Sequence, residues 1–164
     1  MDAEVVVVGA GPSGSVAAGL LARNHDVVIV EEHKSPGDPL QCAGLVTSRG
    51  VPNVAQRSVI GEVRGVRIHS PSGFALELKA RSSRAFVLDR PMFDRLLFED
   101  ALDAGATPML GTSVTDVRVK GNEVVSEISG RDKKGILTSE VVVGADGYRS
   151  ICRKAAGMGA PKHM

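Results

Sequence analysis

The sequence predicts an α/β fold of the Rossmann-like type, with a central parallel sheet, a three-stranded antiparallel meander and part of a second antiparallel sheet. Three observations predict it. A run of four valines, Val5–Val8, leads into a glycine-rich turn and then into small residues suited to a helix. A second apolar run follows at Val27–Val30, where the next strand of a βαβ unit would begin. A third, Val141–Val143, again breaks at a glycine-rich turn.

The turn after the first strand has the pattern Gly9-x-Gly11-x-x-Gly14, which in this context is typical of a dinucleotide-binding site. Gly9 permits the tight turn, Gly11 lets the backbone approach a pyrophosphate, and Gly14 lets the following helix lie close to the sheet. The helix is predicted over residues 13–23. Its free N–H groups would face the phosphates, where the helix dipole favours negative charge.

Two acidic residues, Glu31 and Glu32, end the second predicted strand. A carboxylate at the tip of this strand can accept both hydroxyls of an adenosine ribose. We favour this role, with Glu31 ahead of Glu32, over the alternative of a solvated strand end. Because the same charge would repel a 2′-phosphate, the nucleotide is expected to be FAD or NAD rather than NADP.

Composition narrows the classes of function. The 164 residues predict one domain, and 43% hydrophobic with 24% charged residues is an ordinary globular mixture. A formal net charge of +1, no tryptophan and one tyrosine argue against nucleic-acid binding. Cys42 and Cys152 fit neither a disulfide framework nor a zinc site, and no metal is expected. With no membrane-spanning run and no room for a signal peptide, we expect a cytoplasmic protein with at most peripheral membrane contact.

A loop at residues 33–39, with two prolines and a glycine, precedes Cys42. A cysteine followed by two small residues beyond a nucleotide-binding strand is either a functional thiol or a small buried hydrophobic residue. The local sequence leaves both interpretations open.

From Val63 to Leu88, short alternating segments predict an inserted antiparallel ribbon. Lys79, Arg81 and Arg84 form a basic cluster there. We interpret the cluster as a solvated strand end rather than as a device that steers an anionic substrate.

Asp89 is predicted to cap a helix that has Pro91 in its first turn and ends at Gly105. A short strand should follow this crossover helix, and then a meander that ends in a buried strand. The strand is predicted at residues 107–110 and the meander at 113–119, 123–129 and 135–143.

Three motifs together resemble the FAD-binding portion of the aromatic-hydroxylase-like flavoproteins. They are the first glycine turn, Asp89-Arg90-x-x-Phe93-Asp94-x-x-Leu97 and Gly144-Ala145-Asp146-Gly147-x-x-Ser150. Within that superfamily, Pro39-x-Gln41-Cys42-Ala43-Gly44 and the segment around Arg90 are most similar to the geranylgeranyl reductase family, which includes archaeal enzymes that saturate the isoprenoid chains of membrane lipids. The resemblance covers nearly the whole chain.

The resemblance implies that FAD is the cofactor. The first turn would hold the pyrophosphate, Glu31 the adenosine ribose, and Val114 the adenine through its backbone. Arg90 would reach the phosphate or ribityl region, with an exposed helix-start arginine as the alternative. The implied cofactor-binding residues are Gly9, Gly11, Pro12, Ser13, Gly14, Glu31, Glu32, Cys42, Ala43, Gly44, Arg90, Val114, Asp146 and Gly147.

Two of these segments carry further expectations. Cys42, Ala43 and Gly44 would lie beside the isoalloxazine, and Cys42 is the one candidate catalytic side chain. Asp146 and Gly147 would belong to a loop that closes over the cofactor, and Asp146 could also cap a helix beginning near Tyr148. Cys152 matches no motif and is interpreted as helix packing.

The resemblance implies an FAD-dependent reductase that acts on a prenyl lipid and takes electrons from ferredoxin or a nicotinamide cofactor. Such a reaction needs an alkene positioned in an apolar pocket that excludes water, and no catalytic acid–base pair is required. The alternatives are an FAD-dependent monooxygenase or halogenase of the same superfamily, and a non-catalytic nucleotide-binding fragment.

Members of the resembled family are substantially longer, and their additional C-terminal part carries a second Gly-Asp segment and the elements that enclose the lipid. Residues 1–164 are therefore interpreted as a truncated form that consists of the FAD-binding domain without the substrate portion.

We predict weak or partial FAD binding by the isolated chain, because that second Gly-Asp segment would hold the ribityl end of the cofactor. The flavin absorbance of the purified protein and its titration with FAD measure this. A tightly bound, stoichiometric yellow cofactor after purification would contradict the prediction.

Overall fold

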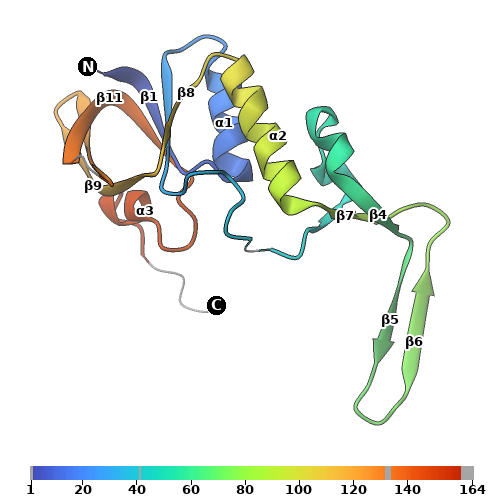
Figure 1. Cartoon of the computed structure of the whole chain (residues 1–164). Coiled ribbons are helices and arrows are strands. Elements are labelled where there is room, and N and C mark those ends of the chain that lie inside the picture. The colour runs from blue at the N-terminus through green and yellow to red at the C-terminus, as the bar shows by residue number, and fades with distance from the viewer. Residues whose placement is uncertain (1, 41, 132–133, 160–164) are drawn as a thin grey trace.

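The computed structural model describes residues 2–40, 42–131 and 134–159, and its centre is a six-stranded sheet (Figure 1). In order across the sheet, the strands are β8 (Thr107–Leu110), β2 (Val27–Glu31), β1 (Ala3–Val8), β11 (Lys134–Gly144), β10 (Glu123–Gly130) and β9 (Thr112–Lys120). Strands β8, β2, β1 and β11 are parallel, and β9, β10 and β11 form an antiparallel meander. The predicted α/β fold is confirmed.

Strand β1 is buried on both faces, as a run of valines predicts. Its Val6 lies between Val28 of β2 and Val142 of β11. Helices α1 (Pro12–Leu21) and α2 (Arg90–Asp103) lie side by side and cover one face of the sheet (Figure 1). They approach closely because Gly19 has no side chain: a Cβ there would lie 3.3 Å from the Cα of Ala101.

The other face of the parallel strands packs against the meander and the short helix α3 (Ile151–Ala155). Val8 and Val30 contribute to this second core from the parallel strands, and Val114 contributes from β9. The meander therefore continues the sheet and also covers part of it, which brings β9 near the ends of β1 and β2.

The helix boundaries agree in part with those predicted from the sequence. α1 begins one residue earlier than predicted and ends two residues earlier. For α2 the prediction is confirmed, because the Asp89 carboxylate accepts the Met92 N–H at 3.0 Å and Gly105 follows the helix with a φ of +110°. α3 begins at Ile151 rather than near Tyr148. None of the helices in the described part of the chain is both long and apolar enough to cross a membrane.

The segment between the nucleotide strands and α2 forms two small sheets rather than one ribbon. β3 (Leu45–Thr47), β7 (Ala85–Leu88) and β4 (Val59–Val63) make a three-stranded sheet, with 3-10 turns at Ser48–Gly50 and Asn53–Ser58. Only β5 (Gly65–His69) and β6 (Ala75–Lys79) form an isolated ribbon. β7 belongs to the first sheet because its Phe86 and Leu88 pack against the apolar face of α2.

Candidate functional site

The two glycine-rich turns touch each other at the carboxyl ends of β1 and β11. Gly9 has a φ of +97°, and a Cβ at this position would lie 2.5 Å from the carbonyl oxygen of Ala145. The Ala145 N–H donates to the Val8 carbonyl at 2.8 Å, and the Gly9 N–H donates to the Val30 carbonyl at 2.8 Å. Only glycine fits at position 9, because any side chain would separate the two turns.

The other two glycines of the first turn differ in what surrounds them. A Cβ at Gly14 would lie 1.8 Å from the Gly9 carbonyl oxygen, so packing within the protein explains this glycine. A Cβ at Gly11 would meet no protein atom within 4 Å, and Gly11 lines an open cleft. No side chain caps the start of α1 at Gly11. Because Gly11 has no side chain, the backbone of the turn stays open toward the cleft, where a ligand can reach it.

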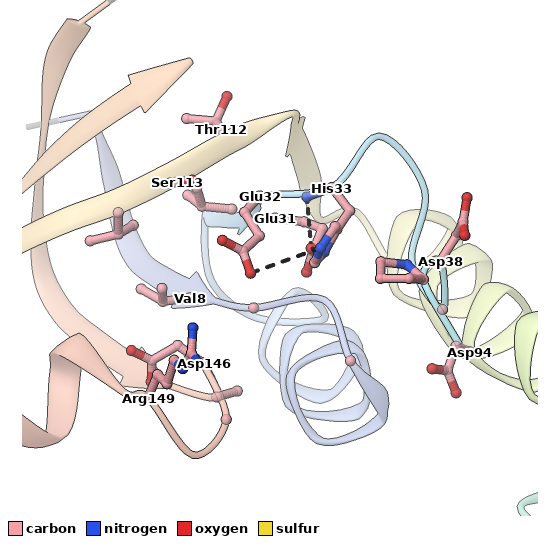
Figure 2. Close-up of a pocket in the computed structure, with 18 of the residues that line it drawn as sticks. Val8, Glu31, Glu32, His33, Asp38, Asp94, Thr112, Ser113, Asp146 and Arg149 are labelled. Atoms are coloured by element: carbon pink, nitrogen blue, oxygen red, sulfur yellow. Dashed lines mark hydrogen bonds and ion pairs between the residues drawn. The ribbon is translucent and has the colours of Figure 1, made fainter. Parts of the chain in front are cut away.

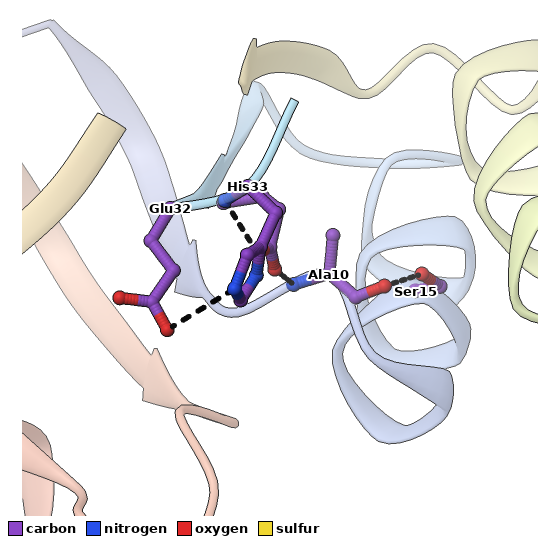
Figure 3. Close-up of polar contacts among 5 residues, drawn as sticks. Ala10, Ser15, Glu32 and His33 are labelled. Atoms are coloured by element: carbon purple, nitrogen blue, oxygen red, sulfur yellow. Dashed lines mark hydrogen bonds and ion pairs between the residues drawn. The ribbon is translucent and has the colours of Figure 1, made fainter. Parts of the chain in front are cut away.

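At the tip of β2, Glu32 and His33 lie beside Ala10 of the glycine turn (Figure 3). Glu31 is buried there and ties this strand to the glycine turn. Its Oε2 accepts the Ala10 N–H at 2.8 Å, and its Oε1 accepts the His33 N–H at 2.9 Å and lies 2.6 Å from His33 Nδ1. Glu32 is exposed and reaches His33 Nε2 only at 4.0 Å. This arrangement agrees with placing Glu31 ahead of Glu32, and the ribose role itself stays a prediction.

A cleft of about 620 Å³ runs past both turns, the tip of β2 and the edge strand β9 (Figure 2). This volume lies within the range of small-molecule and cofactor sites. The predicted residues that line it are Gly9, Gly11, Pro12, Glu31, Glu32, Arg90, Val114, Asp146 and Gly147. The predicted residues Ser13, Gly14, Cys42, Ala43 and Gly44 are not among its lining residues.

Arg90, at the start of α2, is held inside the structure rather than exposed. Its side chain is 16% exposed, and its guanidinium forms a forked pair with the Asp94 carboxylate at 2.9 and 3.0 Å. Burial raises the pKa of Asp94, and the guanidinium opposes that shift. The interpretation of Arg90 as an exposed helix-start residue is therefore wrong, while its role toward the cofactor stays a prediction.

The Cys42 loop is fixed through Gly44, which has a φ of +76°. A Cβ at Gly44 would lie 2.6 Å from the Leu88 carbonyl oxygen, and the Leu88 N–H donates to the Gly44 carbonyl at 2.9 Å. The Cys42 thiol is exposed, so the interpretation as a small buried residue is wrong. A hydrogen bond from the Gly44 N–H and the nearby Arg90 guanidinium lower the pKa of Cys42. Gln41, part of the same motif, lies outside the described residues.

Asp146 precedes α3 and binds the first residues of that helix through hydrogen bonds. It does not cap a helix near Tyr148. Its carboxylate accepts from the Ser150 hydroxyl at 2.6 Å and from the backbone N–H groups of Ile151 at 2.6 Å and Cys152 at 3.1 Å. Burial raises the pKa of Asp146, but these hydrogen bonds outweigh it and bring the pKa below its ordinary value. The N-cap of α3 is Ser150, whose hydroxyl accepts the Arg153 N–H at 2.8 Å, so the prediction of Asp146 as the cap of a helix near Tyr148 is wrong.

Cys152 packs on β11, which agrees with its interpretation as a helix-packing residue. A Cβ at Gly144 would lie 2.5 Å from the Cys152 Cβ, so the strand and α3 are in close contact. Burial and the neighbouring Asp146 carboxylate raise the pKa of Cys152 to about 12. This thiol stays protonated at physiological pH and serves packing.

Sequence reasoning missed several residues of the cleft. His33 could have been found, because it follows the acidic pair by one position and contacts Glu31. Thr112 and Ser113 lie on the edge strand β9 and enter the cleft only because the meander curls over the sheet (Figure 2). Arg149 lines the cleft from the second turn. Among the described residues, no group of three His, Cys, Asp or Glu side chains is arranged to hold a metal ion.

Comparison with known proteins identifies the family. The family model described as FAD binding domain matches residues 2–164. The chain belongs to this FAD-binding domain family. It is 36% identical to digeranylgeranylglycerophospholipid reductase of Methanothrix thermoacetophila over 96% of its own length and 42% of that protein. The chain thus spans less than half the length of this relative.

Two solved structures share the fold of this chain over nearly its whole length. A geranylgeranyl bacteriochlorophyll reductase-like protein from Thermoplasma acidophilum matches 90% of this chain and 40% of its own, with 27% identity and a TM-score of 0.78. An aklavinone-11 hydroxylase solved with FAD and aklavinone matches 99% of this chain and 36% of its own, with 26% identity and a TM-score of 0.74.

The cofactor of the family is FAD, and the cleft fits it. Gly11 leaves the backbone open to the cleft with no protein atom occupying the position of a side chain. Glu31 presents a buried carboxylate at the β2 tip, where a nucleotide ribose is bound in folds of this class. The first glycine turn therefore offers a surface for pyrophosphate, and the tip of β2 offers one for ribose.

Replacing Gly11 separates ligand binding from folding. Gly11→Ala should leave the urea-unfolding free energy almost unchanged, because its Cβ meets no protein atom within 4 Å. FAD affinity should fall by about tenfold or more, since the methyl group would occupy space needed by the pyrophosphate. Fluorescence titration with FAD measures the affinity, and unchanged affinity in Gly11→Ala would argue against the cradle.

Asp146→Asn should weaken the α3 attachment. The variant should be less stable by about 1 kcal/mol at neutral pH, because the charge-assisted hydrogen bonds are lost. The folded-state pKa lies below the ordinary value of 3.8, so this stability is present above that value and is lost as pH falls through the folded pKa.

Urea unfolding at neutral and acidic pH measures the Asp146 contribution, with Asp100→Asn on the exposed side of α2 as the matched control. The difference between the wild type and Asp146→Asn should shrink at acidic pH. A difference that is constant or larger at acidic pH would contradict the account.

The two thiols should react at very different rates. Cys42 is exposed with a lowered pKa, and Cys152 is half-buried with a pKa of about 12, so iodoacetamide should alkylate Cys42 at least about tenfold faster near neutral pH. Mass spectrometry of the native protein over time measures both rates. Equal rates, or faster reaction at Cys152, would be inconsistent with the structure.

Proposed function

We propose that this chain is the FAD-binding part of a flavin-dependent reductase that saturates the isoprenoid double bonds of prenyl lipids. The observation that carries the proposal is the exposed Cys42 thiol, which lies beside Arg90. Arg90 in turn lines the dinucleotide cleft. The similarity to a protein named digeranylgeranylglycerophospholipid reductase supports the same substrate class.

In this proposal the cleft binds FAD along its length. The backbone at Gly11 holds the pyrophosphate, Glu31 binds the adenosine ribose, and the backbone of the edge strand β9 at Val114 contacts the adenine. Asp146 fixes the second turn, which closes the cleft beside the pyrophosphate. Arg90 lies toward the flavin end, paired with Asp94.

We assign the Cys42 loop to the flavin end because the Cys42 thiol lies near Arg90, although the loop itself does not line the cleft. The FAD group, once reduced, supplies the hydride that saturation of a carbon–carbon double bond requires. The second hydrogen is a proton, and Cys42 Sγ is the titratable atom of the loop that can hold it. The pKa of this thiol is lowered by the Gly44 N–H and by Arg90, which brings proton exchange closer to neutral pH.

The partners of the complete protein follow from the same proposal. A prenyl lipid is the substrate, and ferredoxin or a nicotinamide cofactor supplies electrons. Since the chain spans 42% of its reductase relative, the activity is assigned to the whole protein, in which further residues enclose the lipid. A lipid substrate also favours peripheral contact with a membrane.

A second candidate function is an FAD-dependent monooxygenase or halogenase, supported by the structural match of 99% of the chain to aklavinone-11 hydroxylase. Hydroxylation of an aromatic compound by the reduced protein and oxygen, with a prenyl lipid left unchanged, would favour this function. Failure of both reactions with FAD bound would leave a non-catalytic nucleotide-binding role.

Replacing Cys42 distinguishes these candidates. Cys42→Ser in the full-length protein should abolish most alkene reduction while FAD stays bound, because the serine hydroxyl does not ionise near neutral pH. Mass spectrometry of the lipid measures reduction, and flavin absorbance measures occupancy. Cys152→Ala, which removes the other thiol, is the matched control. Unchanged reduction in Cys42→Ser would remove this thiol from the mechanism.

A further inference from the structure

The Glu31 carboxylate has too few acceptor sites left to bind both hydroxyls of a ribose. Its two oxygens offer about four lone-pair sites. Oε1 accepts the His33 backbone N–H at 2.9 Å and contacts Nδ1 of the His33 ring at 2.6 Å, and Oε2 accepts the Ala10 N–H at 2.8 Å. These bonds use both sites of Oε1 and one site of Oε2. A second group near Glu31 is therefore needed to accept the other ribose hydroxyl.

His33 is held firmly against Glu31. Besides the bond from its backbone N–H to Glu31, its carbonyl accepts the Gly111 N–H at 2.9 Å, which ties it to the connection between β8 and β9. The bond from its ring to the buried carboxylate is charge-assisted. A ribose hydroxyl that displaced the ring would form one charge-assisted bond and break another, with little net gain. The ring and the carboxylate therefore act as one unit.

The opposite nitrogen of the His33 ring can accept a hydrogen bond from a ligand. A carboxylate oxygen only accepts, so the 2.6 Å contact places a proton on Nδ1, and Nε2 of the neutral ring is an acceptor. Nε2 lies 4.0 Å from Glu32 Oε1, beyond hydrogen-bond distance, and none of the described residues forms a hydrogen bond with it. His33 lines the cleft, with its ring between the first turn and Glu32 (Figure 3). Nε2 therefore supplies the acceptor that Glu31 lacks.

Glu32 is the competing candidate for the second acceptor. It also lines the cleft, but its carboxylate forms no hydrogen bond with any residue in the described part of the chain. Fixing this side chain on a ligand would cost rotamer freedom, whereas the His33 ring is already fixed by Glu31. A prearranged acceptor binds the same hydroxyl more tightly, which favours His33.

We propose that a Glu31–His33 pair binds the adenosine ribose of FAD, with Glu31 Oε2 accepting one hydroxyl and His33 Nε2 accepting the other. The proposal rests on the ribose role of Glu31 in the proposed function, and it adds a cofactor-binding residue to that site. Two acceptors matched to two hydroxyls also make the site selective, because a nucleotide that lacks either hydroxyl leaves one acceptor without its bond.

Calorimetric titration of the purified chain with ADP tests the pair, because ADP contains the ribose without the flavin. The wild type should bind 2′-deoxy-ADP and 3′-deoxy-ADP each about fivefold or more weakly than ADP. His33→Asn should bind ADP about fivefold or more weakly than the wild type does. In this variant one of the two deoxy nucleotides should bind as well as ADP, because the hydroxyl that it lacks no longer has an acceptor.

A second substitution separates ribose binding from the positioning of Glu31. The amide of an asparagine can donate to Glu31 from the place of Nδ1, whereas the amide of a glutamine reaches the place of Nε2. His33→Gln should therefore restore most of the ADP affinity and the discrimination against both deoxy nucleotides. The reverse order, with full discrimination in His33→Asn and loss in His33→Gln, would show that His33 only positions Glu31 and would overturn the proposal.

His25→Asn is the matched control, because His25 Nδ1 also lies against a carboxylate, that of Glu4 at 3.3 Å, and neither residue lines the cleft. This control should bind ADP like the wild type, and urea unfolding should show that both His33 variants are folded. Loss of hydroxyl discrimination in Glu32→Gln, with His33→Asn unchanged, would assign the second hydroxyl to Glu32 and overturn the proposal.

Two further results separate the role of His33 from that of Glu31. If the wild type binds ADP and 2′,3′-dideoxy-ADP equally, the ribose role of Glu31 is wrong and the pair is overturned with it. If the wild type discriminates between them and both His33 variants keep the same discrimination, Glu31 retains its role and only the assignment of His33 is overturned.

Discussion

The structure depends on a contact between two backbone turns that are separated by most of the chain. Gly9 lies so close to Ala145 that a Cβ would collide with its carbonyl oxygen at 2.5 Å. The Ala145 N–H and the Val8 carbonyl are joined by a hydrogen bond at the same point. This contact places the carboxyl ends of β1 and β11 together, where ligands bind in open α/β sheets.

The other parts of the cleft are positioned by this contact. β11 is the last strand of the meander, so its pairing with β1 brings the meander back across the sheet and sets β9 over the cleft. Glu31 adds a third connection, because its carboxylate bonds to the N–H of Ala10 in the first turn. Asp146 extends the arrangement to α3 through Ile151. The cleft is therefore shaped by the backbone contact between the two turns together with two carboxylates, those of Glu31 and Asp146.

Features that depend on local pattern could be predicted from the sequence. The valine runs, the glycine spacing and the Asp89 cap each follow from a few neighbouring residues, and the structure contains all three. The exposure of Cys42 could not be predicted, since it depends on how Leu88 of β7 fixes Gly44 at the start of the neighbouring strand β3. The separation of β7 from the ribbon likewise depends on packing against α2, which has no signature within β7 itself.

The most direct test of the central contact is amide hydrogen exchange in Gly9→Ala, followed by mass spectrometry of peptides that cover residues 145–152. If the two turns support each other, this substitution should increase exchange at Ala145 and at the start of α3, although they lie far from position 9 in sequence. Unchanged protection of those residues, with faster exchange confined to the first turn, would contradict the account.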